Sequence, residues 1–227
     1  MIKNIFLDVG GVILDETEFE EITSKIIANI IEKYNANYSI EDYWNNVDEA
    51  VYRFVPKVYD YILYKNINGI NDFDKFKTQY RNELNLSNIK YKLMDGINDF
   101  LKIASKQYEI GIIGQYGKDF KQYLKEINLY KYFTFTEIQD DYKITKPDSR
   151  YFEAILKKCK CRPEESIMVG DRIDKDIIPA KMVGMKTIRV KIGIHKNQEP
   201  RIPNEIPDLT VNKIEEIKME TIKVNSL

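Results

Sequence analysis

Two apolar runs in this sequence end at aspartates, and the spacing of these acids could assemble a reactive carboxylate beside a metal site. Asp8 directly follows Ile5-Phe6-Leu7, and Asp171 follows the run Ser166–Val169, with Asp176 five residues further on. Because α/β sheets carry their chemistry where strands end, we expect both groups of acids at a sheet edge. Carboxylate oxygens are the ligands that Mg²⁺ prefers. Each segment also has an ordinary structural explanation, since acids favour turns and helix N-termini.

Two further segments could bind an anion. Lys146 contributes a cation, although its position before Pro147 is also that of an ordinary lysine ahead of a proline-initiated helix. Gly114 and Gln115 follow the apolar run Ile110–Ile113. The backbone amides of such a glycine-containing turn can bind phosphate, and the Gln115 amide could add a donor. Alternatively, Gly114 serves only a tight turn.

Strands and helices alternate in the segments around these residues. Short apolar runs predict buried strands, and apolar residues at three- and four-residue spacing predict helices. The expected strands cover Ile5–Leu7, Tyr108–Gly114, Phe133–Ile138, Ser166–Val169, Met185–Val190 and Leu209–Val211. The expected helices between them cover Gly96–Ala104, Lys118–Ile127, Asp148–Lys158 and Ile173–Val183. This alternation predicts an α/β fold with a doubly wound parallel sheet.

A helical insert interrupts this pattern. Residues 16–90 contain several amphipathic segments, one of which opens with a capping box at Ser39 and Asp42. We therefore expect an α/β core built from residues 1–15 and 91–227, with a small all-helical domain between the two parts. Aromatic residues at helical spacing usually pack in a core, and this predicts buried positions rather than a substrate platform. They are Trp44, Tyr52, Tyr59, Tyr61 and Tyr64.

The composition favours a small-molecule partner. The chain has 35 basic and 36 acidic side chains, so it offers no basic surface for nucleic acid or an anionic membrane. No apolar stretch approaches the roughly 18–20 residues of a membrane span, and we expect a cytoplasmic monomer or homodimer. Cys159 and Cys161 are too close together for a structural disulfide and are expected to be free thiols. His195 has no neighbouring imidazole or thiol and is expected at the surface.

Taken together, four segments resemble the motifs of the haloacid dehalogenase (HAD) superfamily, in the family's order. They are Ile2–Asp15, the residues around Gly114, Lys146-Pro147-Asp148 and Gly170-Asp171-x4-Asp176. The resemblance extends from Ile2 to about Val211. It implies a Rossmann-like core, and the insert between the first and second motifs resembles the C1-type helical cap of one large subgroup.

The resemblance also implies roles for individual residues. Asp8 would be the nucleophile that attacks phosphorus or carbon, and Lys146 would pair with it and with the substrate phosphate. Mg²⁺ would be bound by Asp8, the carbonyl of Gly10 and Asp171. Asp176 would support Asp171 from outside the ligand set or through Lys146. Gly114, Gln115 and Lys146 would hold a small phosphorylated substrate, and Asp174 would be solvated.

Gly10 departs from the family pattern, because the phosphatases usually carry a second aspartate there. That side chain protonates the leaving group and then activates water. Glycine keeps a carbonyl for the metal but supplies no acid, a loss typically worth ~10²–10⁴-fold in rate. Asp15, Glu16 or Glu18 could substitute as the acid.

Three functions remain open at this point. The first is a Mg²⁺-dependent phosphatase that forms an aspartyl-phosphate on Asp8 and prefers substrates with good leaving groups. The second is a 2-haloacid dehalogenase-like hydrolase, whose members usually lack the Gly-Asp-x4-Asp motif that this sequence retains. The third is a weakly active or non-catalytic HAD-like protein that binds a phosphorylated metabolite or a protein partner.

Overall fold

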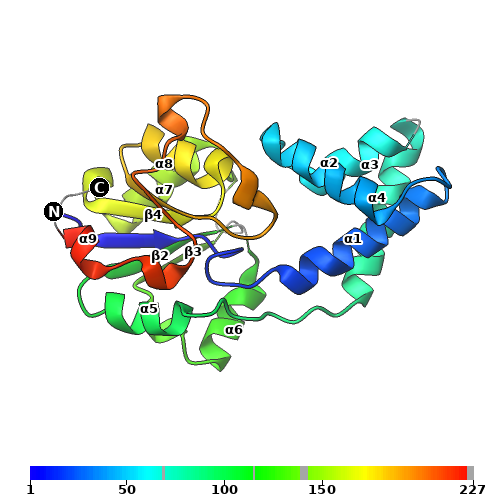
Figure 1. Cartoon of the computed structure of the whole chain (residues 1–227). Coiled ribbons are helices and arrows are strands. Elements are labelled where there is room, and N and C mark those ends of the chain that lie inside the picture. The colour runs from blue at the N-terminus through cyan, green and yellow to red at the C-terminus, as the bar shows by residue number, and fades with distance from the viewer. Residues whose placement is uncertain (68–69, 115, 139–142, 224–227) are drawn as a thin grey trace. The chain divides into compact units, whose positions relative to one another are not determined.

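The chain forms two compact units in the computed structural model, which describes residues 1–67, 70–114, 116–138 and 143–223 (Figure 1). Residues Met1–Asp15 and Tyr91–Leu227 form one unit, and Glu16–Lys90 form the other. We call them the α/β unit and the helical unit. Among the helices described, none is both long and apolar enough to cross a membrane.

The α/β unit is built on a parallel sheet whose described strands lie in the order β3-β2-β1-β4-β5-β6. The strands are β1 (Asn4–Leu7), β2 (Glu109–Gly114), β3 (Phe135–Ile138), β4 (Ser166–Gly170), β5 (Lys186–Val190) and β6 (Leu209–Val211). At the end of the central strand β1, Leu7 is in register with Ile112 on β2 and Val169 on β4. The strand order therefore reverses beside β1, which is where ligands bind in such sheets.

Helices cover both faces of this sheet, as the predicted doubly wound fold requires (Figure 1). Ile5 and Leu7 pack on the side of α5, while Phe6 packs on the other side with residues of α7 and α8. This alternation follows from the two-residue period of a strand. The α-helices of the unit are α5 (Ile97–Ala104), α6 (Lys118–Glu126), α7 (Ser149–Cys159), α8 (Ile178–Met182) and α9 (Met219–Lys223).

Shorter helical turns connect these elements. The segment predicted as one helix over Ile173–Val183 instead begins as a π-helix, η4 (Ile173–Ile177), and continues as α8. The other short turns in the described residues include five 3₁₀-helices: η1 (Tyr130–Tyr132), η3 (Pro163–Glu165), η5 (Ile194–Asn197), η6 (Pro203–Glu205) and η7 (Ile214–Glu216). A π-turn is rare and often marks a functional site, and here it lies directly after Asp171.

The helical unit consists of α1 (Thr17–Glu32), α2 (Ile40–Tyr52), α3 (Val58–Asn66) and α4 (Ile70–Leu86). The predicted capping box is present at the start of α2, where the Ser39 hydroxyl accepts from the Asp42 N–H and the Asp42 carboxylate accepts from the Ser39 N–H. The prediction that the aromatic residues are buried is wrong for Tyr52 and Tyr64, which are 69% and 60% exposed, and Trp44 is exposed as well. Tyr43 occupies the core position beside Trp44.

Candidate active site

Asp8 stands at the carboxyl end of β1, where the backbone turns sharply. Its N–H donates to the carbonyl of Val169 at 2.9 Å, so the residue continues the pairing of β1 with β4. Gly11 has a φ of +69°, and a Cβ atom built there would lie only 3.2 Å from Cγ of Asp171. Gly11 therefore permits both the sharp turn after Asp8 and the close approach of that turn to Asp171.

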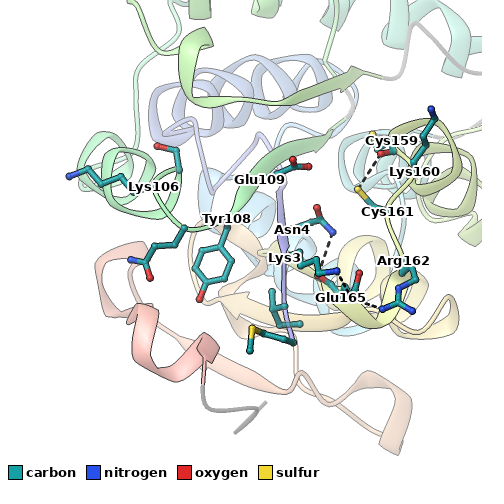
Figure 2. A pocket seen from close by; sticks show the side chains of 14 residues that line it. Lys3, Asn4, Lys106, Tyr108, Glu109, Cys159, Lys160, Cys161, Arg162 and Glu165 are labelled. Carbon is teal, nitrogen blue, oxygen red and sulfur yellow. Dashed lines mark hydrogen bonds and ion pairs between the residues drawn. The ribbon is translucent and has the colours of Figure 1, made fainter.

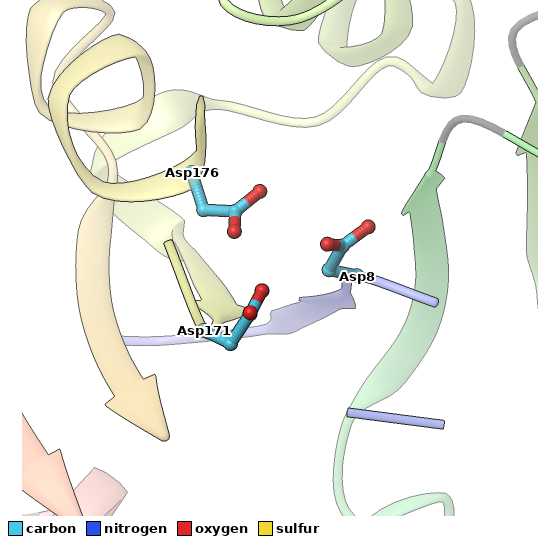
Figure 3. A group of neighbouring side chains, drawn as sticks. All are labelled: Asp8, Asp171 and Asp176. Carbon is cyan, nitrogen blue, oxygen red and sulfur yellow. The ribbon is translucent and has the colours of Figure 1, made fainter. Parts of the chain in front are cut away.

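Asp171 and Asp176 come from the end of β4 and the π-helix after it. A Cβ atom on Gly170 would lie 2.4 Å from that of Asp176, so glycine is needed where the chain folds back. The Arg172 N–H donates to Oδ2 of Asp176 at 3.0 Å and fixes this carboxylate. Figure 3 shows the three side chains converging; Asp8, Asp171 and Asp176 are buried and each offers an oxygen within 4.8 Å of the others.

Lys146 joins two of these acids. Its Nζ atom lies 2.7 Å from Oδ1 of Asp8 and 2.6 Å from Oδ1 of Asp176, and its side chain is 2% exposed. Burial alone would lower the pKa of Lys146, but the charges of Asp176 and Asp8 outweigh burial and raise it. Lys146 is therefore charged at neutral pH. Burial raises the pKa of Asp176 to about 6 despite this lysine, and the nearby charge of Asp8 adds to the increase.

The composition of this cluster fits a metal ion. Three carboxylates and one ammonium group meet in a buried space, and a cation would offset the excess negative charge. All the offered side-chain atoms are oxygens, which hard divalent cations such as Mg²⁺ prefer over softer metals. The cluster could therefore hold a metal ion between Asp8 and Asp171.

Two expectations about neighbouring residues are wrong. Asp174 is only 9% exposed, because Arg172 binds both of its carboxylate oxygens, at 3.0 and 2.6 Å. His195 is 8% exposed rather than at the surface, and no described group bonds to its Nδ1 atom. Burial and the nearby charges of Arg172 and Lys175 lower the pKa of His195 well below its usual value, so the ring is neutral.

Two buried polar residues that hold the backbone around Asp171 were not predicted from the sequence. Gln198 accepts from the N–H of Ile173, and Arg189 donates to the carbonyl of Asp171. Arg189 could have been recognised as a candidate site residue, because it is a charged residue within the predicted strand Met185–Val190. Gln198 could not have been recognised in this way, because it lies in a polar loop where a glutamine is ordinary.

Gly114 ends β2, as expected, and its carbonyl accepts from the Tyr151 hydroxyl at 3.0 Å. Its φ lies outside the left-handed region, so a tight turn is not the reason for glycine. A Cβ atom at this position would lie 2.4 Å from Cγ2 of Val9, so glycine provides room for the residue after Asp8. Gln115 lies outside the described residues.

A separate cavity of about 630 Å³ lies at the opposite edge of the sheet, where β1 and β2 begin (Figure 2). Glu165 on its wall pairs with Lys3 and Arg162. Cys159 and Cys161 also line it and are free thiols, as predicted. Burial raises the pKa of Cys161 to about 11, so this thiol is protonated at neutral pH.

Comparison with known proteins agrees with the parallel α/β fold. A family model described as haloacid dehalogenase-like hydrolase matches residues 5–190, and the chain belongs to this family. It is a HAD-like hydrolase, as the motifs predicted.

Particular relatives span nearly the whole chain. A glyceraldehyde 3-phosphate phosphatase from Methanocaldococcus jannaschii is 27% identical over 226 residues, covering 96% of each chain. The protein of the same name from Pyrococcus furiosus is 29% identical and covers 85% of this chain and 82% of its own. Among solved structures, a haloacid dehalogenase-like hydrolase from Streptococcus pneumoniae superimposes with a TM-score of 0.69 at 17% identity, covering 95% of this chain and 96% of its own.

Proposed function

We propose that this protein is a Mg²⁺-dependent phosphatase that acts on a small phosphorylated metabolite. The observation that carries the proposal is the buried cluster of Asp8, Asp171 and Asp176, with Lys146 bridging two of the acids. The names of the relatives, glyceraldehyde 3-phosphate phosphatases, point to phosphate ester hydrolysis as well. Asp8 and Asp171, with the carbonyl of Gly10, would hold the ion, and Asp176 would act from outside the ligand set through Lys146.

Asp8 is the nucleophile in this proposal. One of its carboxylate oxygens attacks the phosphorus atom, the bond from phosphorus to the ester oxygen breaks, and an aspartyl-phosphate forms. Lys146 holds the attacking carboxylate close to the anionic substrate and offsets the repulsion between them. A cation held by Asp8 and Asp171 would supply further charge stabilisation to the phosphoryl oxygens. Water then hydrolyses the aspartyl-phosphate and regenerates Asp8.

We also propose that the helical unit, residues 16–90, is the cap of this hydrolase. It is a compact unit inserted between Asp15 and Tyr91, after the first motif and before the second. In the α/β unit, Gly114 and Gln115 would contact the phosphate.

Gly10 affects the substrate preference. Without a carboxylic acid at this position, the departing oxygen receives no proton from the side chain two residues after Asp8. Asp15 is an alternative acid, but its carboxylate is paired with Lys92 at 2.6 Å. We therefore expect faster turnover of aryl, acyl and anomeric phosphates, whose leaving groups need less protonation, than of alkyl phosphates.

The decisive experiment measures phosphate release from p-nitrophenyl phosphate, acetyl phosphate, glucose 1-phosphate and glyceraldehyde 3-phosphate. Wild-type protein should require Mg²⁺ and lose activity in EDTA. Asp8→Asn should lose at least about 10³-fold, because it lacks the nucleophile, while Asp99→Asn, at an exposed aspartate of the same unit, should retain full activity.

The same panel tests the effect of Gly10. Gly10→Asp should raise the rate on glyceraldehyde 3-phosphate by about 10-fold or more and change the aryl phosphate rate little, since general acid catalysis helps poor leaving groups most. The φ of Gly10 lies outside the left-handed region, so aspartate can adopt this backbone. Equal wild-type rates across leaving groups would contradict the role of Gly10. Ligand-induced stabilisation without product would favour a binding protein, and halide release without metal would favour a dehalogenase.

A further inference from the structure

The backbone that carries Asp171 and Asp176 is held by a side chain from a distant segment. Gln198 follows the 3₁₀-helix η5 and is completely buried. Its Oε1 atom accepts from the Ile173 N–H at 2.7 Å, and its Nε2 atom donates to Oδ1 of Asp174 at 2.8 Å. One amide thus satisfies the first N–H of the π-helix and orients the acid beside it.

Arg189, which lies on β5, binds the backbone of both Gln198 and Asp171. Its Nη1 atom donates to the carbonyl of Gln198 at 2.7 Å, and its Nε atom donates to the carbonyl of Asp171 at 3.3 Å. Its Nη2 atom donates to the carbonyls of His195 and Lys196. All four of these acceptors are backbone carbonyl oxygens. A buried guanidinium that binds only carbonyl oxygens orders the backbone on both sides of it.

These contacts extend to both aspartates. Asp174, held by Gln198, binds the side chain of Arg172. The backbone N–H of Arg172 in turn donates to the carboxylate of Asp176. Arg189, which binds the carbonyl of Gln198, also donates to the carbonyl of Asp171 at the other end of the segment. Gln198 therefore connects with both ends of the six-residue segment 171–176.

We propose that Gln198 is a positioning residue for the cation site and that Arg189 acts with it. By fixing the segment 171–176, Gln198 holds Asp171 in place as a ligand and keeps Asp176 in contact with Lys146. This inference rests on the proposed function in one respect, because it takes Asp171 as a ligand. The match to the family model ends at residue 190, before Gln198.

The test is Mg²⁺ binding to the full-length, EDTA-treated protein, measured by titration calorimetry. Gln198→Met keeps the length of the side chain and removes both hydrogen bonds. It should weaken Mg²⁺ binding by about 10–100-fold, the usual effect of losing a residue that orients metal ligands. The Mg²⁺ concentration that gives half-maximal phosphate release should increase by the same factor.

Asn4→Leu is the matched control. Asn4 is also a buried amide, and it bonds to the Ser166 hydroxyl at the opposite edge of the sheet. Asn4→Leu should lower the melting temperature in EDTA, as Gln198→Met does, and leave Mg²⁺ affinity within about twofold of wild type because the two sites are far apart. Arg189→Lys provides a second test if Gln198→Met does not fold. It keeps the charge but not the planar set of donors, and it should weaken Mg²⁺ binding about 10-fold.

The outcomes separate this inference from the proposed function. Weaker Mg²⁺ binding by Gln198→Met or Arg189→Lys, with Asn4→Leu unchanged, supports the inference. If the wild type binds Mg²⁺ and releases phosphate while these variants bind Mg²⁺ equally well, the positioning role is overturned and the phosphatase stands. If the wild type binds no Mg²⁺ and releases no phosphate, both fail.

Discussion

Lys146 is the residue on which the charge balance of the site depends. Its ammonium group lies between Asp8 and Asp176, and its side chain is almost fully buried. Breaking a buried ion pair costs more than breaking a surface pair, because the remaining charges cannot be solvated. At this position, removing one cation leaves two acids without that partner.

We therefore predict that Lys146→Met lowers the free energy of unfolding in EDTA by about 3–5 kcal/mol. Activity should be lost as well, and Mg²⁺ should restore part of the stability by supplying positive charge. Urea unfolding with and without Mg²⁺ measures both effects. Lys65→Met is the control, because Lys65 pairs with Glu49 at an exposed site and should contribute at most about 1 kcal/mol. Equal losses in the two variants would contradict the prediction.

At this scale the sequence predicts some of the site well. Asp8 and Asp171 each follow an apolar run, and parallel pairing of β1 with β4 brings such positions together. The burial of Asp174 and His195 could not be predicted, because it depends on Arg172 and on the packing of the loop at 194–198. Contacts of this kind have no periodicity or motif in the sequence.

The elements around the site are fixed by close packing as much as by their own preferences. Gly114 at the end of β2 touches Val9, the residue after Asp8. Glycine has no side chain that could bind a phosphate, so only the backbone at this position could do so. In this chain, however, any side chain there meets a buried valine with little freedom to rotate.

We predict that Gly114→Ser destabilises the protein by about 1–3 kcal/mol through overpacking. In a double-mutant cycle with Val9→Ala, thermal unfolding should reveal a favourable coupling of about 0.5–3 kcal/mol, because the smaller residue makes room for the serine. Gly117→Ser serves as the control: Gly117 is the N-cap of α6 with a φ of −82°, and serine is accepted at such positions. Strict additivity in the Gly114 and Val9 cycle would show that their contact is not the cause.

Element types could be predicted from the sequence because the central strands are short apolar runs and the long helices have apolar faces. Element boundaries agree to within a few residues, as for α7, whose N-cap is Asp148. The π-helix could not be predicted, since the run Ile173–Val183 has ordinary helical spacing. Its wider turn is stabilised by Gln198, which binds the N–H of Ile173 from outside the segment.

The two compact units differ in how far apart in the sequence their contacts lie. In the helical unit, α1 packs on α2 and α4, all within residues 16–90. In the α/β unit, Asn4 on β1 is in register with Glu109 and Ser166. Contacts between distant segments form more slowly, because the intervening chain must be ordered first.

We predict that the helical unit becomes protected from hydrogen exchange before β1 when the unfolded protein is diluted into native buffer. Pulse labelling followed by mass spectrometry of peptides from α1, α2 and β1 measures this order. Peptides from α5, which belongs to the α/β unit, provide the comparison within a helix. Simultaneous protection of α1 and β1 would mean that the two units fold as one.

The central place of β1 in the sheet has a consequence for synthesis on the ribosome. Ile5, Phe6 and Leu7 are made well before one of their neighbouring strands, β4, which begins only at Ser166. At roughly 5–20 residues per second, this segment waits about 8–30 s for that neighbour. During that interval an apolar segment with unpaired backbone groups is available to chaperones or to other nascent chains.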